Sequence, residues 1–494
     1  MIFLVLFIAL ILRLINLNQS LWLDEAVQAV TAKGPFLGIF EELRGDFHPP
    51  LYHLLLWGWV RIFGASEVSL RIPSVIFGTA TIWVLYLITK QIVPKKFSIF
   101  NFQFSIPEIA ALFLATAPFH IYYSQEARMY SMTTFFAALS MYFFVKILNL
   151  KTQNLKLHLK SKIFYFISTL CLIYSDYYGF LVLLVQIIGG VIIFRKNLNL
   201  YISKFLYLYI PIFLFYLPWV PFLITQFKTG LAATSDLPGW GNLVNVSFLK
   251  AVPLTFVKFI IGRITIFNKN YYAFTMGILI LIYGAIILKG IFKKGKLSVN
   301  NYQLVIVNWL IVPIFWAWIV SLFIPNYQPF RLLLVLPAFY LLLVIGISSL
   351  QSNKVAVFLS SFVILVNLTS LLVYYRNSYF WREDWRGVAN LVRTNDIPII
   401  ISAQAFNWPL VYYGVEDKVI NVAPGAKLVE LSDIPSLLKK IADKKKIFYT
   451  PYLADLYDPK KLVPTWFEKD GFVKIKEISF NQVPLWIYKN ENWN

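Results

Sequence analysis

Apolar runs about as long as a bilayer is thick recur along the chain as far as residue 375. A helix needs about 20 mostly apolar residues to cross the hydrocarbon core of a membrane. Hydrophobic residue types make up 59% of the 494 residues and charged types 14%, whereas soluble domains hold about 45–50% and about 25%. These numbers exclude a soluble or disordered protein and predict a polytopic α-helical membrane protein. We predict eleven crossings, at about 1–17, 71–90, 107–123, 131–148, 163–176, 179–195, 204–223, 272–291, 303–324, 332–350 and 355–374.

The net charge of the chain, +21, is explained by membrane topology. Basic residues gather in alternate loops, for example at Lys95, Lys151 and Lys294, whereas nearly all acids of residues 1–375 lie in the opposite loops. Loops rich in lysine and arginine stay in the cytoplasm. We therefore expect a multi-pass protein of the plasma or inner membrane, with its N-terminus in the cytoplasm and its C-terminus outside. No nucleic-acid partner is expected, because topology accounts for the excess charge.

The composition changes at about residue 376, where charged residues become more frequent and Pro and Asp punctuate short runs. We predict a transmembrane domain, 1–375, with long outer loops at 18–70 and 224–271, and a small extracytoplasmic α/β domain, 376–494. Short runs rich in β-branched and aromatic residues predict strands in the second domain. The expected strands are 397–403, 446–450, 472–480 and 484–489, and the expected helices are 384–394 and 432–445.

Two groups of polar residues lie in the first outer loop. Asp24 and Glu25 directly follow the first predicted helix, and the run from Asp46 to Tyr52 comes later in the same loop. An ordinary solvated loop also carries such charges. However, Pro49 and Pro50 stop any preceding helix and fix a turn, which would hold His48 and Tyr52 in a defined place.

Two further groups lie between predicted helices on the same outer side. The hairpin from His120 to Tyr130 carries Gln125, Glu126 and Arg128, where small turn residues would suffice. A local ion pair between Glu126 and Arg128 would contribute only about 0–1 kcal/mol. The second of these two groups runs from Pro325 to Arg331, and Arg331 either extends to lipid headgroups or binds a phosphate.

Together these groups suit the transfer of a group from a phosphate leaving group. A lipid phosphate leaves as a stable anion, so it needs cations to bind it rather than an acid to protonate it. The acceptor hydroxyl needs a base, which a positioned carboxylate supplies. The histidines show no HExxH spacing, so a divalent-metal site is left open and no other cofactor is expected. No Walker A motif is present, which argues against a nucleotide-driven pump.

The three motifs Leu23-Asp24-Glu25, His48–Tyr52 and Ser124–Tyr130, in this order, resemble the bacterial branch of the dolichyl-phosphate-mannose protein mannosyltransferase superfamily. These are GT-C glycosyltransferases that use polyprenyl-phosphate sugars, and the aminoarabinose transferases of lipid A are relatives. The resemblance implies that Asp24 is the catalytic aspartate, Glu25 its neighbour and Glu126 the acid of the second loop. It also implies phosphate contacts from Arg128 and Arg331. We expect the further substrate-binding residues to be His48, Tyr52, Gln125 and Tyr130.

The activity that this resemblance implies is the inverting transfer of a monosaccharide on the extracytoplasmic side of the membrane. The donor would be a polyprenyl-phosphate-linked sugar and the acceptor a hydroxyl of a glycan, a lipid or a protein, with membrane lipids around the enzyme. The tail does not resemble the MIR module of eukaryotic protein mannosyltransferases, which leaves the acceptor open. One alternative is a transporter or flippase of a lipid-linked sugar, a class that tends to show internal repeats and intramembrane charges. Another is a polymerase or ligase of surface polysaccharide.

Overall fold

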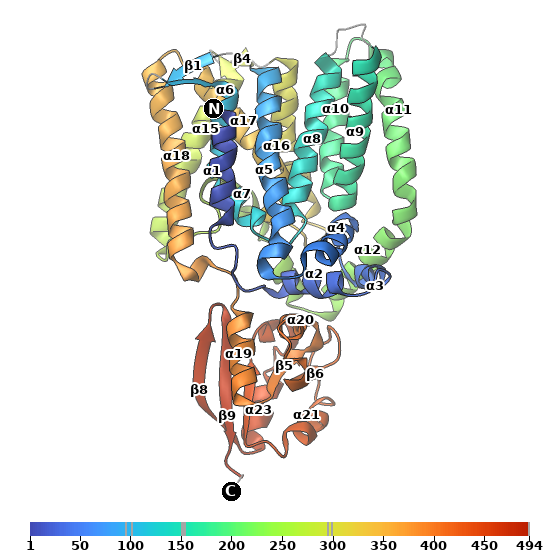
Figure 1. Cartoon of the computed structure of the whole chain (residues 1–494), viewed down its shortest axis with the longest axis vertical. Helices are drawn as coiled ribbons and strands as arrows, with labels where there is room; N and C mark the ends of the chain where they lie inside the picture. Colours follow the sequence, from blue (N-terminus) through green and yellow to red (C-terminus); the bar gives the residue numbers. More distant parts are fainter. Residues whose placement is uncertain (94–95, 100–101, 150–154, 294–295, 298–299, 493–494) are drawn as a thin grey trace.

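The computed structural model describes residues 1–93, 96–99, 102–149, 155–293, 296–297 and 300–492. A helical part comes first and a small sheet domain follows it, at the lower end of the molecule in Figure 1. Lys95, Lys151 and Lys294, which the topology prediction uses, lie outside the described residues.

The upper layer in Figure 1 consists of upright helices packed side by side. In the described part of the chain, eight helical segments are long and apolar enough to cross a membrane, and three shorter apolar helices accompany them. One of the eight, Trp240–Ile261, lies in the predicted outer loop 224–271. The chain is therefore a membrane protein with many spanning helices, while the count of eleven crossings stays a prediction. The upright helices are α1 (Ile2–Leu14), α5 (Glu67–Ile92), α6 (Ile106–Thr116), α8 (Tyr130–Asn149), α9 (Leu155–Ser175), α10 (Gly179–Ile193), α11 (Leu198–Tyr216), α15 (Lys269–Ile291), α16 (Asn301–Val320), α17 (Leu336–Ser348) and α18 (Asn353–Arg376).

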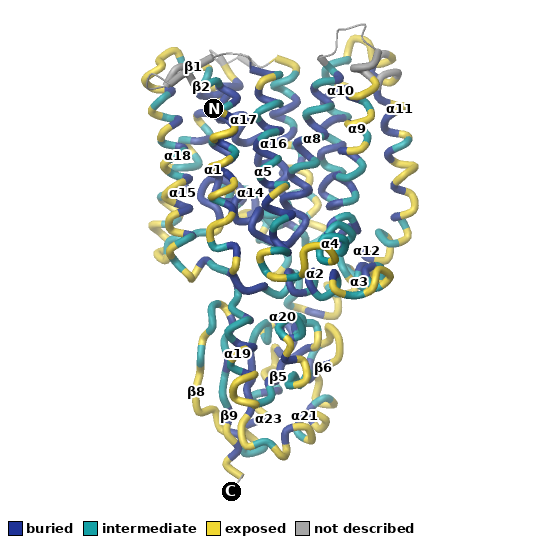
Figure 2. Tube along the Cα trace, viewed as in Figure 1, coloured by how far each residue is buried: buried dark blue, intermediate teal, exposed yellow. Residues whose placement is uncertain are grey.

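The outward faces of these helices are apolar. Phe3, Tyr207 and Leu281 are exposed, and Figure 2 shows exposed residues along the outer helices α11 and α18. By contrast, α17 is buried almost throughout. A surface this rich in large apolar side chains matches the hydrocarbon core of a membrane, where it faces lipid tails instead of water. Short hairpins, β1 (Lys96–Ile99) with β2 (Phe102–Ser105) and β3 (Phe292–Lys293) with β4 (Lys296–Leu297), join helices at the upper end.

Prolines break two of the predicted spans near the lower end. The prediction of one continuous helix over 107–123 is wrong, because α6 ends at Thr116 and α7 (Pro118–Ser124) begins one residue later. Ala117 between them has an extended backbone, and Pro118, which has no N–H to donate to the preceding turn, begins the new helix. Similarly, a 3₁₀ segment η2 (Pro329–Val335) precedes α17. These breaks bring Gln125–Arg128 and Arg331 to the lower end of the helices.

Shorter helices from the two long loops cover this lower end (Figure 1). The acids Asp24 and Glu25 lie in the first turn of α2, where the positive end of the helix dipole stabilises them. The second loop continues α11 through a 3₁₀ turn, η1 (Leu217–Trp219). The covering helices are α2 (Leu23–Lys33), α3 (Gly38–Gly45), α4 (Leu51–Phe63), α12 (Val220–Asp236), α13 (Trp240–Val244) and α14 (Phe248–Ile261).

The tail folds into a five-stranded mixed sheet in the order β6-β5-β7-β9-β8. The four predicted strands are present, and a fifth, β6, was not predicted. Apolar side chains of alternating residues pack against helices on the two faces of the sheet. The elements are β5 (Ile399–Ala403), β6 (Val419–Ala423), β7 (Lys446–Thr450), β8 (Phe472–Phe480), β9 (Val483–Asn490), η3 (Ser378–Phe380), α19 (Trp385–Asn395), η4 (Gln404–Phe406), α20 (Trp408–Tyr412), η5 (Glu416–Lys418), α21 (Ile434–Ile441), α22 (Ala454–Tyr457) and α23 (Leu462–Lys469).

The sheet domain packs directly against the outer loops of the helical part. Phe406 and Leu456 of the tail share an apolar cluster with Leu23, at the start of α2, and with Trp240 of α13. The hydroxyl of Tyr413 accepts a hydrogen bond of 2.9 Å from the backbone N–H of Leu21. The tail therefore lies against the segment that carries Asp24.

Candidate active site

Asp24 and Arg128 form an ion pair at the lower end of the helical part. Asp24 Oδ2 lies 2.6 Å from Arg128 Nη1, and the side chain of Asp24 is 36% exposed while that of Arg128 is 9% exposed. Burial raises the pKa of Asp24, and the charge of Arg128 opposes that increase without cancelling it. A carboxylate with a raised pKa is a stronger proton acceptor than an ordinary surface aspartate. Asp24 thus combines access with basicity.

Arg128 is also held by residues from other elements. Its Nη2 donates to His48 Nε2 at 3.0 Å and to the Tyr130 hydroxyl at 3.4 Å. An arginine only donates, so Nε2 of His48 is the acceptor. Burial and the nearby charge of Arg128 lower the pKa of His48, which keeps the ring neutral. Arg128 Nε is buried and has no partner among the described residues, so one donor is left for a ligand.

Glu25, the residue after Asp24 in α2, is fully buried. Its two oxygens accept from Arg71 at 2.8 Å from Nε and 2.5 Å from Nη2. The backbone N–H of Ala127 donates to Oε1 at 2.7 Å, and Arg382 Nε lies 3.5 Å from Oε2. Burial would raise the pKa of Glu25, but Arg71 and Arg382 lower it overall. Glu25 is therefore an ionised carboxylate that joins the first outer loop to the hairpin 120–130.

Glu126 is also buried, and it pairs with a residue from the tail. Arg382 Nη2 lies 3.3 Å from Glu126 Oε2, and its guanidinium lies over the ring of Tyr122 at 4.5 Å. Burial raises the pKa of Glu126 to about 7, against the opposing charge of Arg382. A carboxyl with this pKa changes its charge near neutral pH.

The other predicted substrate-binding residues lie in the packing around the site. The hydroxyl of Tyr52 bonds with Ser74 Oγ at 3.1 Å, deep in the helical part. The amide nitrogen of Gln125 donates to the carbonyl oxygens of Arg13 and Ile15, which connects the hairpin 120–130 to the end of α1. His48 and Tyr130 thus contact Arg128, whereas Tyr52 and Gln125 support the elements behind it.

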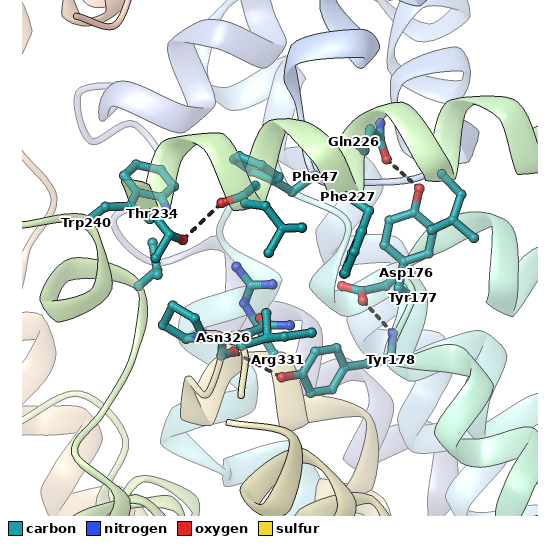
Figure 3. Close-up of a pocket in the computed structure, with 16 residues that line it drawn as sticks. Phe47, Asp176, Tyr177, Tyr178, Gln226, Phe227, Thr234, Trp240, Asn326 and Arg331 are labelled. Atoms are coloured by element: carbon teal, nitrogen blue, oxygen red, sulfur yellow. Dashed lines mark hydrogen bonds between the residues drawn. The ribbon is translucent and has the colours of Figure 1, made fainter. Parts of the chain in front are cut away.

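A pocket lined by Arg331 and Asp176 opens beneath α12 (Figure 3). Its empty volume is about 820 Å³, part of it open to the surroundings. Figure 3 shows the guanidinium of Arg331 directed into this space, and Arg331 Nε is buried without a partner among the residues described. Asp176 lines the same pocket and accepts from the backbone N–H of Tyr178 at 2.9 Å. The hydroxyl of Tyr178 donates to the carbonyl oxygen of Asn326 at 3.0 Å.

The pocket and the Asp24–Arg128 pair form one electrostatic unit. Burial raises the pKa of Asp24, Asp46 and Asp176, and the charges of Arg128 and Arg331 oppose the increase at all three carboxyls. Two arginines with unpaired donors beside a pocket suit a phosphate, because the planar guanidinium matches phosphate oxygens. Within the described ranges, no group of three His, Cys, Asp or Glu side chains is placed to hold a metal ion.

Sequence reasoning missed three residues of this network. Arg71 lies at the start of a predicted span and was taken as the border of the helix. Asp176 lies in a short hairpin, where an acid is common. Arg382 belongs to the tail, which the sequence assigns to another domain. The position of Arg71 just inside the outer end of a spanning helix is the one signal that could have identified it. An unpaired charge there is costly, so it indicates a partner nearby.

Residues 47–224 match the family model described as dolichyl-phosphate-mannose-protein mannosyltransferase. This range includes His48, Glu126 and Arg128 but begins after Asp24. Among solved structures, ArnT from Cupriavidus metallidurans bound to undecaprenyl phosphate superposes with a TM-score of 0.54 at 13% identity, over 98% of this chain and 97% of that one. The oligosaccharyltransferase of Archaeoglobus fulgidus superposes with a TM-score of 0.53 at 13% identity, over 99% of this chain and 73% of that one.

The chain has a GT-C glycosyltransferase fold. A third GT-C structure, the arabinofuranosyltransferase AftD from Mycobacteria, matches with a TM-score of 0.53 at 14% identity, over 99% of this chain and 40% of that one. Among curated protein sequences there is no match. The resemblance is confirmed over the second and third motifs, which lie within 47–224, and the predicted GT-C fold is confirmed.

Proposed function

We propose that this GT-C chain transfers a sugar from a polyprenyl-phosphate carrier to an acceptor hydroxyl, with Asp24 as the base. The observation that carries the proposal is the Asp24–Arg128 pair, whose aspartate also feels the charge of a second arginine, Arg331, that lines a pocket. The site thus offers a proton acceptor and two phosphate-binding cations together. That combination is what transfer from a lipid phosphate requires.

The reaction follows from this arrangement. Arg128 and Arg331 bind the phosphate and stabilise the negative charge that it gains as it leaves. The acceptor oxygen attacks the anomeric carbon, the bond from that carbon to the phosphate oxygen breaks, and the electron pair stays with the phosphate. Asp24 takes the proton of the acceptor hydroxyl. A single displacement of this kind inverts the anomeric centre.

Glu25 and Glu126 have another role in this proposal. Both oxygens of Glu25 are engaged by Arg71, and Glu126 is 1% exposed and paired with Arg382. Neither carboxyl meets an acceptor hydroxyl. They fix the position of the loop that carries Arg128, and we assign them to positioning instead of proton transfer.

An apolar strip on α12 supports a lipid-linked donor. Leu223, Phe227 and Leu231 line the pocket on one side and an adjoining apolar depression on the other, together with Ile224. An isoprenoid chain would lie along this strip while its phosphate reaches Arg331. ArnT, which has the same fold, was solved with undecaprenyl phosphate.

We place the site on the extracytoplasmic side, with residues 1–375 as the transferase domain and 376–494 as an outer domain. The lower end of the helical part carries the acids Asp24, Glu25 and Glu126. Lys90, Lys146 and Lys289 lie in the last turns of α5, α8 and α15, at the other end. This polarity follows the positive-inside rule. The acceptor is a glycan, lipid or protein hydroxyl at the outer surface.

The test uses purified protein in liposomes with radiolabelled polyprenyl-phosphate sugars and cell-envelope acceptor fractions. We expect label to leave the lipid for a new product with wild-type protein and not with Asp24→Asn. If label crosses to the other leaflet without transfer, the protein is a flippase instead. If no donor of a broad panel is consumed, the proposal fails.

A further inference from the structure

The segment that joins α18 to the sheet domain reaches into the candidate active site. Arg382 lies between η3 and α19, yet its side chain is only 2% exposed. Its Nη2 donates to the carbonyl oxygen of Tyr122 at 3.2 Å, in addition to pairing with Glu126. A residue of the tail is therefore surrounded by residues of the transmembrane domain.

Arg382 is the only cation paired with Glu126 among the residues that the structure describes. The second carboxylate within reach of Arg382, Glu25, has Arg71 as its main partner. Glu126 is buried, and a buried carboxylate without a partner is strongly unfavourable. Arg382 is thus the main cation that balances the charge of Glu126, with smaller contributions from Arg128 and Arg263, whereas Glu25 relies mainly on Arg71.

The fold of the sheet domain fixes where Arg382 lies. Asn481, in the turn between β8 and β9, donates its side-chain N–H groups to the carbonyl oxygens of Trp381 at 3.1 Å and Arg382 at 2.9 Å. From the other side, the backbone N–H of Arg382 donates to Gln19 Oε1 at 3.0 Å. Arg382 is clamped between the sheet domain and the first outer loop, so it enters the site only when the two parts are docked.

We propose that Arg382 is a positioning residue through which the outer domain completes the active site. It holds Glu126, and Glu126 holds the loop in which Arg128 follows two residues later. Ala127, between them, is fixed by its N–H bond to Glu25. Arg128 is thereby kept in contact with Asp24. This inference rests on the proposed function, in which Arg128 binds the donor phosphate.

The test compares Arg382→Met with Glu126→Gln, with the double variant and with a control. Arg382→Met/Glu126→Gln removes both charges of the pair and leaves no unpaired carboxylate. Arg386→Met is the matched control, because Arg386 pairs with Glu67 across the same domain junction at 3.3 Å but does not touch Glu126. Each variant is assayed for donor KM and kcat and for hydrogen–deuterium exchange of the segment 125–129.

For Arg382→Met we expect a loss of about 10- to 100-fold in kcat/KM, mainly through a higher donor KM, because a misplaced Arg128 binds the phosphate poorly. Exchange in 125–129 should become faster. Relative to Glu126→Gln alone, the double variant should lose little further activity, since neighbouring residues of one network do not contribute additively. Arg386→Met should match wild type in both measurements.

Two results would overturn the inference. One is unchanged exchange in 125–129 together with wild-type kinetics in Arg382→Met. The other is a loss of activity equal in Arg382→Met and Arg386→Met, which would mean that domain docking alone matters. The exchange measurement needs no donor, so it decides the inference even if wild-type protein transfers no sugar. That last result would contradict the proposed function.

Discussion

Nη1 of Arg128 and Oδ2 of Asp24 lie 2.6 Å apart, although the two residues come from different outer loops. This contact joins the proposed base to the proposed phosphate ligand. Burial raises the pKa of Asp24, and the charge of Arg128 keeps that pKa lower than burial alone would. The predictions below follow from this pairing and from the buried carboxylates behind it.

Replacing Arg331 should weaken donor binding more than it slows the chemical step. Arg331→Met removes a cation whose Nε is buried without a partner among the described residues of the pocket. A hydrogen bond to a charged group contributes about 1.5–3 kcal/mol, so we expect donor KM to rise about 10- to 100-fold. Lys250→Met removes an exposed cation of the outer loop 224–271, serves as control and should leave KM unchanged. A donor KM equal to wild type in Arg331→Met would remove Arg331 from the phosphate site.

Replacing Glu25 should lower the free energy of unfolding of the protein. The side chains of Glu25 and Arg71 are 0% and 1% exposed, and Glu25→Gln leaves a buried arginine without its counter-charge. Breaking a buried ion pair costs about 3–5 kcal/mol. Thermal unfolding in detergent measures the loss. Glu67→Gln breaks the partly exposed pair with Arg386 and should cost about 1 kcal/mol or less. Equal losses in the two variants would contradict the structural role of Glu25.

Stability should depend on pH through Glu126. Its pKa is about 7 in the folded protein, above the ordinary value of 4.5, so the folded state binds this proton more tightly than the unfolded chain. Stability from this group is complete below about pH 4.5 and is lost as pH rises to about 7, by about 3 kcal/mol at most. Glu126→Gln should therefore gain stability relative to wild type between pH 5 and pH 8. If the prediction is wrong, the melting temperatures of wild type and Glu126→Gln will change in parallel across this pH range.

Much of the site could be predicted because its main residues lie in short local motifs. Asp24 directly follows the first helix, and Glu126 and Arg128 share one hairpin, so their side of the membrane follows from the order of the helices. The partners of these residues could not be predicted. Arg71 and Arg382 reach Glu25 from segments 46 and 357 residues away, and nothing in the local sequence marks that contact.

The fold was predicted best where one signal dominates. Long apolar runs gave the upright helices, and alternating runs gave four strands of the tail. The strand β6 was missed because Asn421 interrupts the apolar residues of Val419–Ala423 and the run is short. The break at Pro118 was missed because apolar residues continue on both sides of it. Hydropathy reports burial in lipid or protein, and it does not report whether the helix is continuous.

The transfer of label by Asp24→Asn protein tests the central claim most directly. Asparagine keeps the shape of the side chain and its place in α2 but cannot accept the acceptor's proton. General-base catalysis contributes about 10²- to 10⁴-fold, so we expect kcat to fall by that factor while binding of undecaprenyl phosphate and the melting temperature stay near wild type. Turnover within about threefold of wild type, far short of that factor, would contradict the claim that Asp24 is the base.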